Sequence, residues 1–156
     1  MKKRYNYRIY PNKIQREYIE AIFNINRFIW NQFLAANIRY YNHSKKFHFF
    51  NEMSSILTEC KNIEGYEWLK SVPSTSLQQT LRHLDRAIKD SYKKKKGFPK
   101  FKKKYDKNSF TLTNLQYSIK ENKLKIEIRT FFDCFFIDKV AILISNTPIV
   151  TCFFKL

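Results

Sequence analysis

The sequence feature that most constrains the fold is a run of apolar residues spaced three and four positions apart near the start of the chain. The members of this run are Ile14, Tyr18, Ile22, Ile25, Ile29 and Phe33. Such spacing places the side chains on one face of a helix, and Asn12 with Gln15 forms a capping-box pattern at its start. We therefore expect a long helix that runs to about Tyr41 and packs its apolar face against other elements.

Two shorter helices are expected next. One spans about Asn51 to Lys61, and the other follows Pro73, where Ser74 or Thr75 can cap it. The apolar face of the later helix consists of Leu77, Leu81, Leu84 and Ile88. This face is expected to lie in the core, because its residues again follow the helical period.

The opposite face of the later helix is polar and mostly basic. It carries Gln78, Arg82, Arg86, Lys89 and Lys93. A face of this kind can bind an anion. It can also be a solvated face on which Asp85 and Asp90 form helical ion pairs with nearby bases. The helix pattern alone leaves both interpretations open.

The segment that follows is dominated by lysine. Residues 93–104 contain eight lysines and no acidic residue, with Phe98, Pro99 and Phe101 set between the lysines. Many such stretches are solvated linkers, but the interleaved apolar residues favour a segment that is anchored to a surface and presents its ammonium groups to phosphates. The candidate phosphate contacts in this segment are Lys93, Lys100, Lys102, Lys103 and Lys104.

The charge of the whole chain also indicates an anionic partner. The 156 residues include 30 Lys or Arg and 13 Asp or Glu, which gives a formal net charge of +17. Nucleic acid is the most common polyanionic partner of such chains, and an anionic membrane surface is the competing interpretation. The sequence shows no secretory signal and no uninterrupted apolar block of the ~18 residues that a membrane span needs. We expect a cytoplasmic protein.

The sequence gives no indication of a metal or of another cofactor. Cys60, Cys134 and Cys152 lie far apart, and the three His residues show no paired ligand spacing. We therefore expect reduced cysteines in or near a core, and no cofactor.

Strand patterns occur at both ends of the chain. Apolar and polar residues alternate between Tyr5 and Ile9 and again between Leu124 and Ile128, which is typical of half-buried strands. From Phe131 onward the chain consists of apolar blocks that are cut by Asp133, Asp138 and Lys139. These blocks are interpreted either as buried strands or as unselected sequence.

Several segments resemble one known family when they are taken together. They are YRIYPN at residues 7–12, FIWNQFL at 28–34, WLKSVP at 68–73, LQQTLRHLDRA at 77–87 and GFPKFKKK at 97–104. In order and with compatible spacing over about residues 1–128, they resemble the amino-terminal part of the TnpB (OrfB) proteins of bacterial insertion sequences. Members of that family are RNA-guided DNA endonucleases related to type V CRISPR effectors, and their amino-terminal part carries what is called a helix-turn-helix domain.

The resemblance implies an α+β fold. A helical recognition lobe of about three helices is expected to be inserted into a small, incomplete antiparallel β-barrel. The implied divisions are a first barrel strand at residues 1–12, the helical lobe at 13–92, a basic loop at 93–108, barrel strands at 109–130 and a divergent apolar tail at 131–156.

The resemblance also implies positions that read a short DNA motif beside the target. By motif alignment these positions fall on Phe50, Ser54, Ser74, Thr75, Gln78, Thr113 and Asn114. Glutamine can bond bidentately to adenine, and Asn or Thr can bond bases or phosphates. Two alternatives stay open, because Gln78 could be the capping-box partner of Thr75 and Asn114 could be a turn residue. Phe50 and Ser74 replace the tyrosine and lysine of some family members.

The expected function is binding without cleavage. Full-length family members continue into a RuvC-like nuclease domain with three separated carboxylates and a zinc ribbon, and no motif of that kind is present in this sequence. We therefore expect a truncated, non-enzymatic protein whose partners are DNA and the guide RNA of the transposable element, with neither a membrane nor a small-molecule substrate. The alternatives are one half of a split RNA-guided DNA endonuclease, or a non-functional frameshifted remnant.

Overall fold

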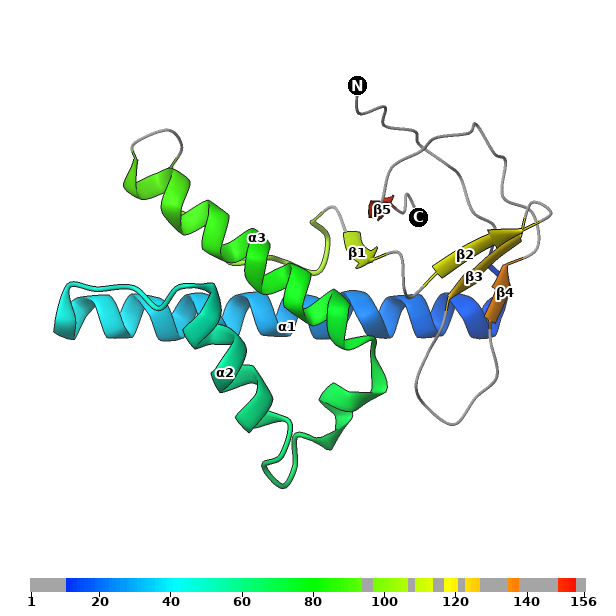
Figure 1. Cartoon of the computed structure of the whole chain (residues 1–156), viewed down its shortest axis with the longest axis horizontal. Helices are drawn as coiled ribbons and strands as arrows, with labels where there is room; N and C mark the ends of the chain where they lie inside the picture. Colours follow the sequence, from blue (N-terminus) through cyan, green and yellow to red (C-terminus); the bar gives the residue numbers. More distant parts are fainter. Residues whose placement is uncertain are drawn as a thin grey trace.

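The computed structural model describes residues 11–93, 97–106, 109–113, 117–120, 123–126, 135–137 and 149–153. Its helices are α1 (Lys13–Ser44), α2 (Phe50–Cys60), the short 3-10 helix η1 (Glu67–Ser71) and α3 (Ser74–Tyr92) (Figure 1). Its strands are β1 (Ser109–Thr113), β2 (Tyr117–Lys120), β3 (Lys123–Ile126), β4 (Phe135–Ile137) and β5 (Ile149–Phe153).

The first helix begins with the capping box that its sequence predicts. The backbone N–H of Gln15 donates to Asn12 Oδ1 over 2.8 Å, and the backbone N–H of Asn12 donates to Gln15 Oε1 over 2.9 Å. These bonds satisfy two backbone donors that a helix start would otherwise leave unpaired. The helix ends at Lys45, which adopts a left-handed conformation with φ 56° and donates its N–H to the Tyr41 carbonyl over 2.9 Å. Residues 13–44 therefore form one uninterrupted helix.

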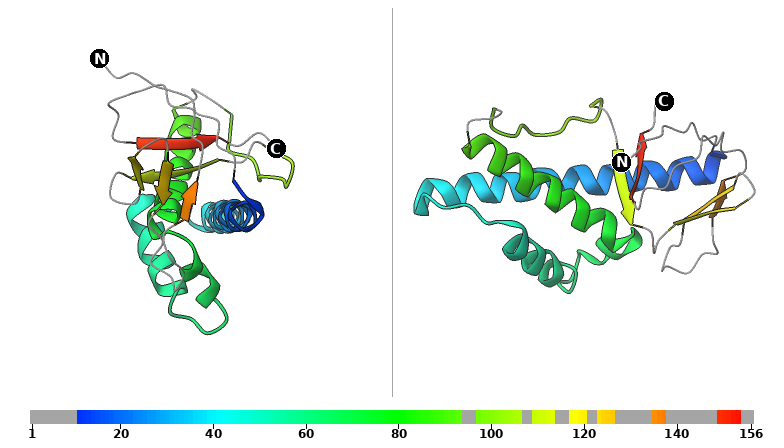
Figure 2. Two further views of the ribbon diagram at one scale, coloured as in Figure 1. Left: turned by 90° about the vertical axis from the view of Figure 1, so that its right-hand side faces the viewer. Right: turned by 45° about the horizontal axis from the view of Figure 1, so that its top comes forward.

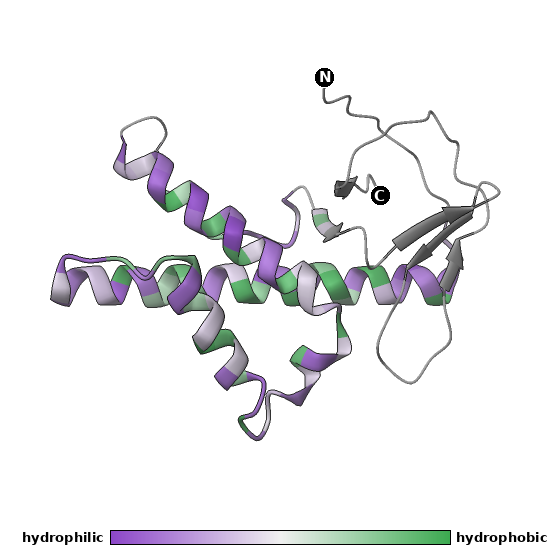
Figure 3. Cartoon of the chain, viewed as in Figure 1, coloured by the Kyte–Doolittle hydropathy of each residue, from purple (hydrophilic) through white to green (hydrophobic). Residues whose placement is uncertain are grey.

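The core lies between the three helices. α3 crosses α1 obliquely, and α2 and α3 lie on the same side of α1 (Figures 1 and 2). Hydrophobic and hydrophilic positions alternate along α1 and α3 (Figure 3), which is the pattern of helices that pack by one face. The fully buried residues of α3 include Leu77, Leu81, Leu84 and Ile88, which confirms the predicted apolar face. They meet Ile22 and Leu34 of α1 and Met53 and Leu57 of α2 in one hydrophobic cluster.

The start of α3 differs from the expectation. Its N-cap residue is Pro73, which has no side chain able to cap, and both Ser74 and Thr75 lie inside the first turn. The N–H of Ser76 bonds to the Pro73 carbonyl over 2.9 Å instead. The prediction that Ser74 or Thr75 caps this helix was therefore wrong, because the proline ring already fixes the backbone angle at the helix entrance.

The predicted α+β fold with a β-barrel was also wrong. The described part of the chain is mostly helical, and its short strands form two separate antiparallel sheets, one with the order β1-β5 and the other with the order β2-β3-β4. A barrel requires the first and last strands of one sheet to pair with each other. In the described three-stranded sheet the outer strands β2 and β4 do not pair, and the other sheet has only two strands. Phe110 of β1 is buried in the helical cluster, where its ring centre lies 5.7 Å from that of Phe23. Phe110 of β1 is therefore part of the helical core.

Parts of the expected domain division fall outside the described residues. Of the first predicted strand, at residues 1–12, the structure describes only Pro11 and Asn12. Of the apolar tail at 131–156, it describes β4 and β5. The division into 1–12, 13–92, 93–108, 109–130 and 131–156 therefore stays a prediction.

Across the described residues, no helix has the length and apolarity that crossing a bilayer requires.

Candidate nucleic-acid interface

Four of the candidate DNA-reading residues meet where α2 lies beside α3. The hydroxyl of Ser54 on α2 donates to Gln78 Oε1 on α3 over 3.0 Å. Nearer the start of α3, Lys61 Nζ donates to Ser74 Oγ over 3.1 Å. Nearer its end, the Phe50 backbone N–H donates to an oxygen of Asp85 over 3.2 Å. These contacts place Phe50, Ser54, Ser74 and Gln78 along one seam, which we call the α2–α3 seam.

The hydrogen bond from Ser54 decides between two interpretations of Gln78. A capping box would join the Gln78 side chain to the start of α3, but Pro73 is the N-cap and has no capping side chain. The Gln78 carbonyl oxygen instead accepts the bond from Ser54. The alternative in which Gln78 is the capping-box partner of Thr75 is therefore excluded.

Two cations beside the α2–α3 seam rest on aromatic rings. The Arg82 guanidinium lies 4.1 Å from the centre of the Phe50 ring, and Lys89 Nζ lies 5.0 Å from the centre of the Phe49 ring. At exposed sites a cation–π contact of this kind contributes about 0.5–1 kcal/mol. It orients the cation without using its hydrogen-bond donors, so the Arg82 donors stay free to meet an anion.

One part of the solvated-face interpretation is correct. Lys89 Nζ lies 2.8 Å from an Asp85 carboxylate oxygen, four residues earlier on α3. An exposed pair of this kind contributes about 0.3–0.5 kcal/mol. The pair partly neutralises Lys89, whereas neither Arg82 nor Arg86 forms an ion pair within the described residues.

Thr75 contributes a buried polar atom to the same region. Its hydroxyl oxygen is buried and has no hydrogen-bond partner among the described residues. A buried hydroxyl without a partner costs free energy relative to water.

Residues 97–106, the described continuous segment of the basic loop, are held against α1 through hydrogen bonds to the loop backbone. Trp30 Nε1 donates to the Lys100 carbonyl over 3.0 Å. Asn31 forms two bonds with Lys102, one from its Nδ2 to the carbonyl over 3.0 Å and one to its Oδ1 from the backbone N–H over 2.8 Å. Lys103 N–H donates to Asp106 Oδ2, which tightens the turn that follows.

The expected anchoring of this loop is confirmed, but the anchors differ from those expected. Phe98 and Phe101, which suggested it, keep 43% and 52% of their surface exposed. Trp30 and Asn31, neighbours on α1, supply the attachment instead. In the sequence, Trp30 belongs to the apolar stripe of a helix and Asn31 is a polar residue beside it. Neither feature identifies a partner some 70 positions away.

Burial and neighbouring positive charges shift the pKa values of Lys102 in the loop and of His83 on α3. Burial lowers the pKa of Lys102, whose Nζ lies 4.2 Å from the centre of the Trp30 ring. Desolvation lowers the pKa of His83 below its ordinary 6.5, and the nearby charges of Lys102 and Arg86 lower it further. These three residues, which we call the cationic cluster, join the charges of Arg86 and Lys102 to an imidazole that stays neutral at pH 7, and an anion beside them would be stabilised.

The α2–α3 seam has a half-buried cation of its own. Burial lowers the pKa of Lys61, and the charge of Lys70 contributes to the same shift. Neither Lys61 nor His83 was among the residues expected from the sequence. Lys61 follows the end of α2, and only the packing of α2 on α3 brings it to Ser74.

The remaining candidate residues are placed as follows. Lys93, at the end of α3, is exposed, and so are Lys100, Lys103 and Lys104 in the basic loop. Thr113 is the last residue of β1. Asn114 lies outside the described residues. No group of three or more His, Cys, Asp or Glu able to hold a metal ion occurs in the described part of the chain.

Comparison with known proteins adds independent information. Residues 1–46 match the family model of the helix-turn-helix domain of IS605 OrfB proteins. Within that range the described residues, 11–46, contain a single helix, α1, and no second helix. The family description therefore does not correspond to two helices joined by a turn in this part of the structure.

Three relatives cover different shares of the chain. InsQ of Escherichia coli K12, named as a putative RNA-guided DNA endonuclease, is 38% identical over 54% of this chain and 21% of its own length. A Streptomyces pristinaespiralis protein of the same description is 28% identical over 83% of this chain and 34% of its own length. The virulence protein VsdF of Salmonella dublin is 31% identical over 64% of this chain and 91% of its own length.

The chain thus spans about a fifth of InsQ and about a third of the Streptomyces relative. These matches confirm the resemblance on which the sequence interpretation relied, and they extend over most of the chain. On this evidence the chain belongs to the TnpB (OrfB) family of insertion-sequence proteins.

Proposed function

We propose that this chain is the nucleic-acid-binding part of a transposon-encoded TnpB-like protein in the bacterial cytoplasm. In this proposal it holds the guide RNA of the element and contacts target DNA, and it does not cleave either strand by itself. Two relatives are named as RNA-guided DNA endonucleases, which supports RNA and DNA as partners.

The observation that carries the proposal is the continuity of polar and basic groups across three segments. The α2–α3 seam offers hydrogen-bonding side chains, and Arg82 and Arg86 continue along α3. The charges of Arg86 and of Lys102 in the basic loop both act on His83 of α3, so the loop adds its cations to the same surface. The formal net charge of +17 makes a polyanion the natural partner of this surface.

The proposal divides the residues by role. Phosphates are bound by Arg82, Arg86, Lys89, Lys93, Lys100, Lys102, Lys103 and Lys104. DNA bases or their adjoining phosphates are contacted by Phe50, Ser54, Ser74, Thr75, Gln78, Thr113 and Asn114. Phosphate contacts of this kind set affinity and register, whereas contacts with base edges set sequence preference.

Gln78 is the residue best suited to read a base. Ser54 occupies one lone pair of its carbonyl oxygen and fixes the orientation of the amide. The second lone pair and the amide N–H groups are then available to an adenine edge, where a bidentate pair discriminates by about 1–3 kcal/mol.

The test compares Gln78→Ala with Gln79→Ala. The two residues are neighbours on α3 and are both intermediate in exposure, but only Gln78 is bonded to Ser54. Duplexes are selected from a randomised pool by the full chain, and the enriched sequences are then measured by fluorescence anisotropy. We expect Gln78→Ala to reduce the preference for the selected sequence over the unselected pool by about fivefold or more, and Gln79→Ala to leave it unchanged. Equal effects of the two variants, or no binding by the wild type, would refute the proposal.

A second candidate function is one half of a split endonuclease. It is favoured by the matches to proteins named as endonucleases, of which this chain covers 21% and 34%. Mixing the chain with a separately produced RuvC-like domain, guide RNA and a supercoiled target plasmid would test it. Cleavage that requires both polypeptides would support the split enzyme over simple binding.

A further inference from the structure

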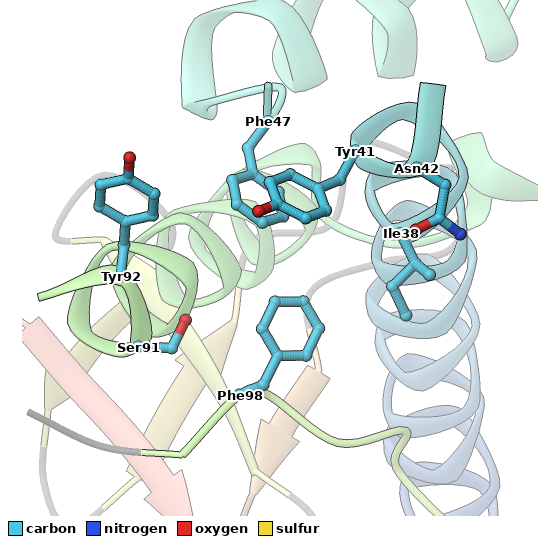
Figure 4. Close-up of a pocket in the computed structure, with 7 residues that line it drawn as sticks. All are labelled: Ile38, Tyr41, Asn42, Phe47, Ser91, Tyr92 and Phe98. Atoms are coloured by element: carbon cyan, nitrogen blue, oxygen red, sulfur yellow. The ribbon is translucent and has the colours of Figure 1, made fainter. Parts of the chain in front are cut away.

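An aromatic pocket lies at the end of the molecule where α1 and α3 both terminate (Figure 4). It has a volume of about 490 Å³, which is within the range of small-ligand sites. It is formed by the end of α1, the connection to α2, the end of α3 and the first residues of the basic loop. The lining residues are Ile38, Tyr41, Asn42, Phe47, Ser91, Tyr92 and Phe98.

One wall of the pocket is a pair of stacked aromatic rings. The rings of Tyr41 and Phe47 stack with 4.5 Å between their centres and 10° between their planes. Phe98 lies across from them, with 6.1 Å between its ring centre and that of Phe47 (Figure 4). The Tyr41–Phe47 pair is held between α1 and the connection to α2, so this wall is formed before any ligand binds.

Two of the rings that line the pocket keep much of their surface exposed to solvent. Tyr92 keeps 76% of its surface exposed and Phe98 keeps 43%, although both line the pocket. Exposed apolar groups that converge on one hollow mark a site of interaction, because covering them removes apolar area from water.

Charge complementarity selects the kind of occupant. No lining residue is acidic, and Lys45 Nζ lies 5.6 Å from the centre of the Tyr41 ring. Lys46 is exposed next to it, and Lys93 is exposed next to Tyr92. A cation over one wall and further lysines at the rim disfavour a basic or purely apolar partner and favour one that combines a flat apolar group with negative charge.

An unpaired nucleotide has that combination. Its base can stack on aromatic rings, and its phosphate can meet the rim lysines. Asn42 lines the pocket, is exposed, and its side-chain amide forms no hydrogen bond with the described residues, so it can bond a base edge. The basic face of α3 leads from Gln78 to Tyr92 over about 21 Å, at ~1.5 Å per helical residue.

We propose that this pocket receives an unpaired base of single-stranded nucleic acid, stacked against Phe98, Tyr92 and the Tyr41–Phe47 pair. The inference rests on the proposed nucleic-acid binding and adds a preference for single strands to it. The base enters between Phe98 and Tyr41, and the adjoining phosphates lie against Lys45 and Lys93.

The experiment uses the full chain and two matched pairs of variants. Phe98→Leu and Tyr92→Leu remove rings from the pocket. Phe101→Leu and Tyr105→Leu remove exposed rings of the basic loop that do not line it. The probes are oligothymidylate, oligouridylate and a duplex of the same length, each measured by fluorescence anisotropy at several salt concentrations. A further oligothymidylate carries the fluorescent adenine analogue aminopurine, whose emission is quenched when it stacks.

We expect Phe98→Leu and Tyr92→Leu each to weaken binding of both single strands by about fivefold or more. Binding of the duplex and the slope of log K against log salt stay unchanged, because every phosphate contact is retained. The aminopurine emission is quenched by the wild type and by both control variants, and it is restored in the pocket variants.

The outcomes separate the two proposals. A wild-type chain that binds no nucleic acid overturns the proposed function and this inference with it. A chain that binds, with pocket and control variants indistinguishable on single strands, overturns the base pocket alone. If the pocket variants change only the sedimentation of the free protein, the groove joins two copies of the chain and the base pocket is likewise refuted.

Discussion

At the scale of single residues, His83 reports on the cationic cluster between α3 and the basic loop. Desolvation and the charges of Lys102 and Arg86 lower its pKa below 6.5. Protonation of His83 adds a third positive charge to this cluster. A phosphate bound there would offset the repulsion, so the protonation of His83 and the binding of phosphate favour each other.

The sign of the pH effect on stability follows from this shift. As pH falls below 6.5, the unfolded chain takes up the His83 proton before the folded chain does. The free energy of unfolding therefore decreases below pH 6.5, and the decrease stops once pH has passed the lowered pKa. Urea unfolding across this range should show a weaker pH dependence for His83→Gln than for the wild type, and curves with identical pH dependence would contradict the prediction.

Nuclear magnetic resonance should also show the His83 pKa rising when an oligonucleotide is added.

At the scale of elements, the attachment of the basic loop to α1 depends on a few polar contacts. The bonds from Trp30 and Asn31 are made to the loop backbone, so they use no lysine ammonium group. The Lys102 ammonium lies over the Trp30 ring. A loop that is held by its backbone can present its charges without using side chains for its own attachment. The order of this loop should therefore be sensitive to the removal of one α1 side chain.

Replacing Asn31 by Ala should release the middle of the basic loop. Both bonds to Lys102 are removed, and the free energy of unfolding should fall by about 1–3 kcal/mol, since two partly buried backbone groups are left without their partner. Limited trypsin digestion should cut after the loop lysines faster than in the wild type. The control is Asn24→Ala, an exposed α1 residue whose side chain bonds only Arg27 among the described residues and should change neither measurement. Equal trypsin sensitivity of Asn31→Ala and wild type would show that the loop is held in another way.

At the scale of the whole molecule, the formal charge of +17 governs how binding responds to salt. Lysines that neutralise phosphates release counterions, and log K falls with log salt in proportion to the phosphates contacted. Net charge alone does not tell which lysines take part. The structure divides them, because the basic loop and the exposed face of α3 gather cations, whereas Lys13 lies at the start of α1, more than four turns from the Trp30 and Asn31 side chains that hold the loop.

Neutralising the loop lysines should therefore reduce the salt dependence of binding. Lys103→Gln with Lys104→Gln should lower the magnitude of the slope of log K against log salt by about 0.9 for each duplex phosphate that these lysines neutralise in the wild type. Lys13→Gln changes the net charge as one of these substitutions does, and it should leave the slope unchanged. Anisotropy titrations of a duplex at several salt concentrations measure the slope. If Lys13→Gln lowers the slope as much per charge as the loop substitutions do, binding depends on overall charge and the assigned surface is wrong.

The helices and their buried faces follow from the sequence alone. The capping box of Asn12 and Gln15, the stripe from Ile22 to Phe33 and the buried face of α3 were predictable, whereas Ile14, at the start of the predicted stripe, is 68% exposed. Each depends on residues within four positions of one another, so their geometry is set by the helix itself. The family could be recognised for a similar reason, since its motifs are short local strings.

Only the tertiary structure determined how these elements use their polar residues. It paired Gln78 with Ser54 and attached Lys102 to Asn31, and it buried Phe110 among helices where a barrel was expected. Each of these arrangements joins residues that are far apart in the chain. Local spacing carries no information about such partners, because the partner is chosen by which surfaces the packed core brings within reach.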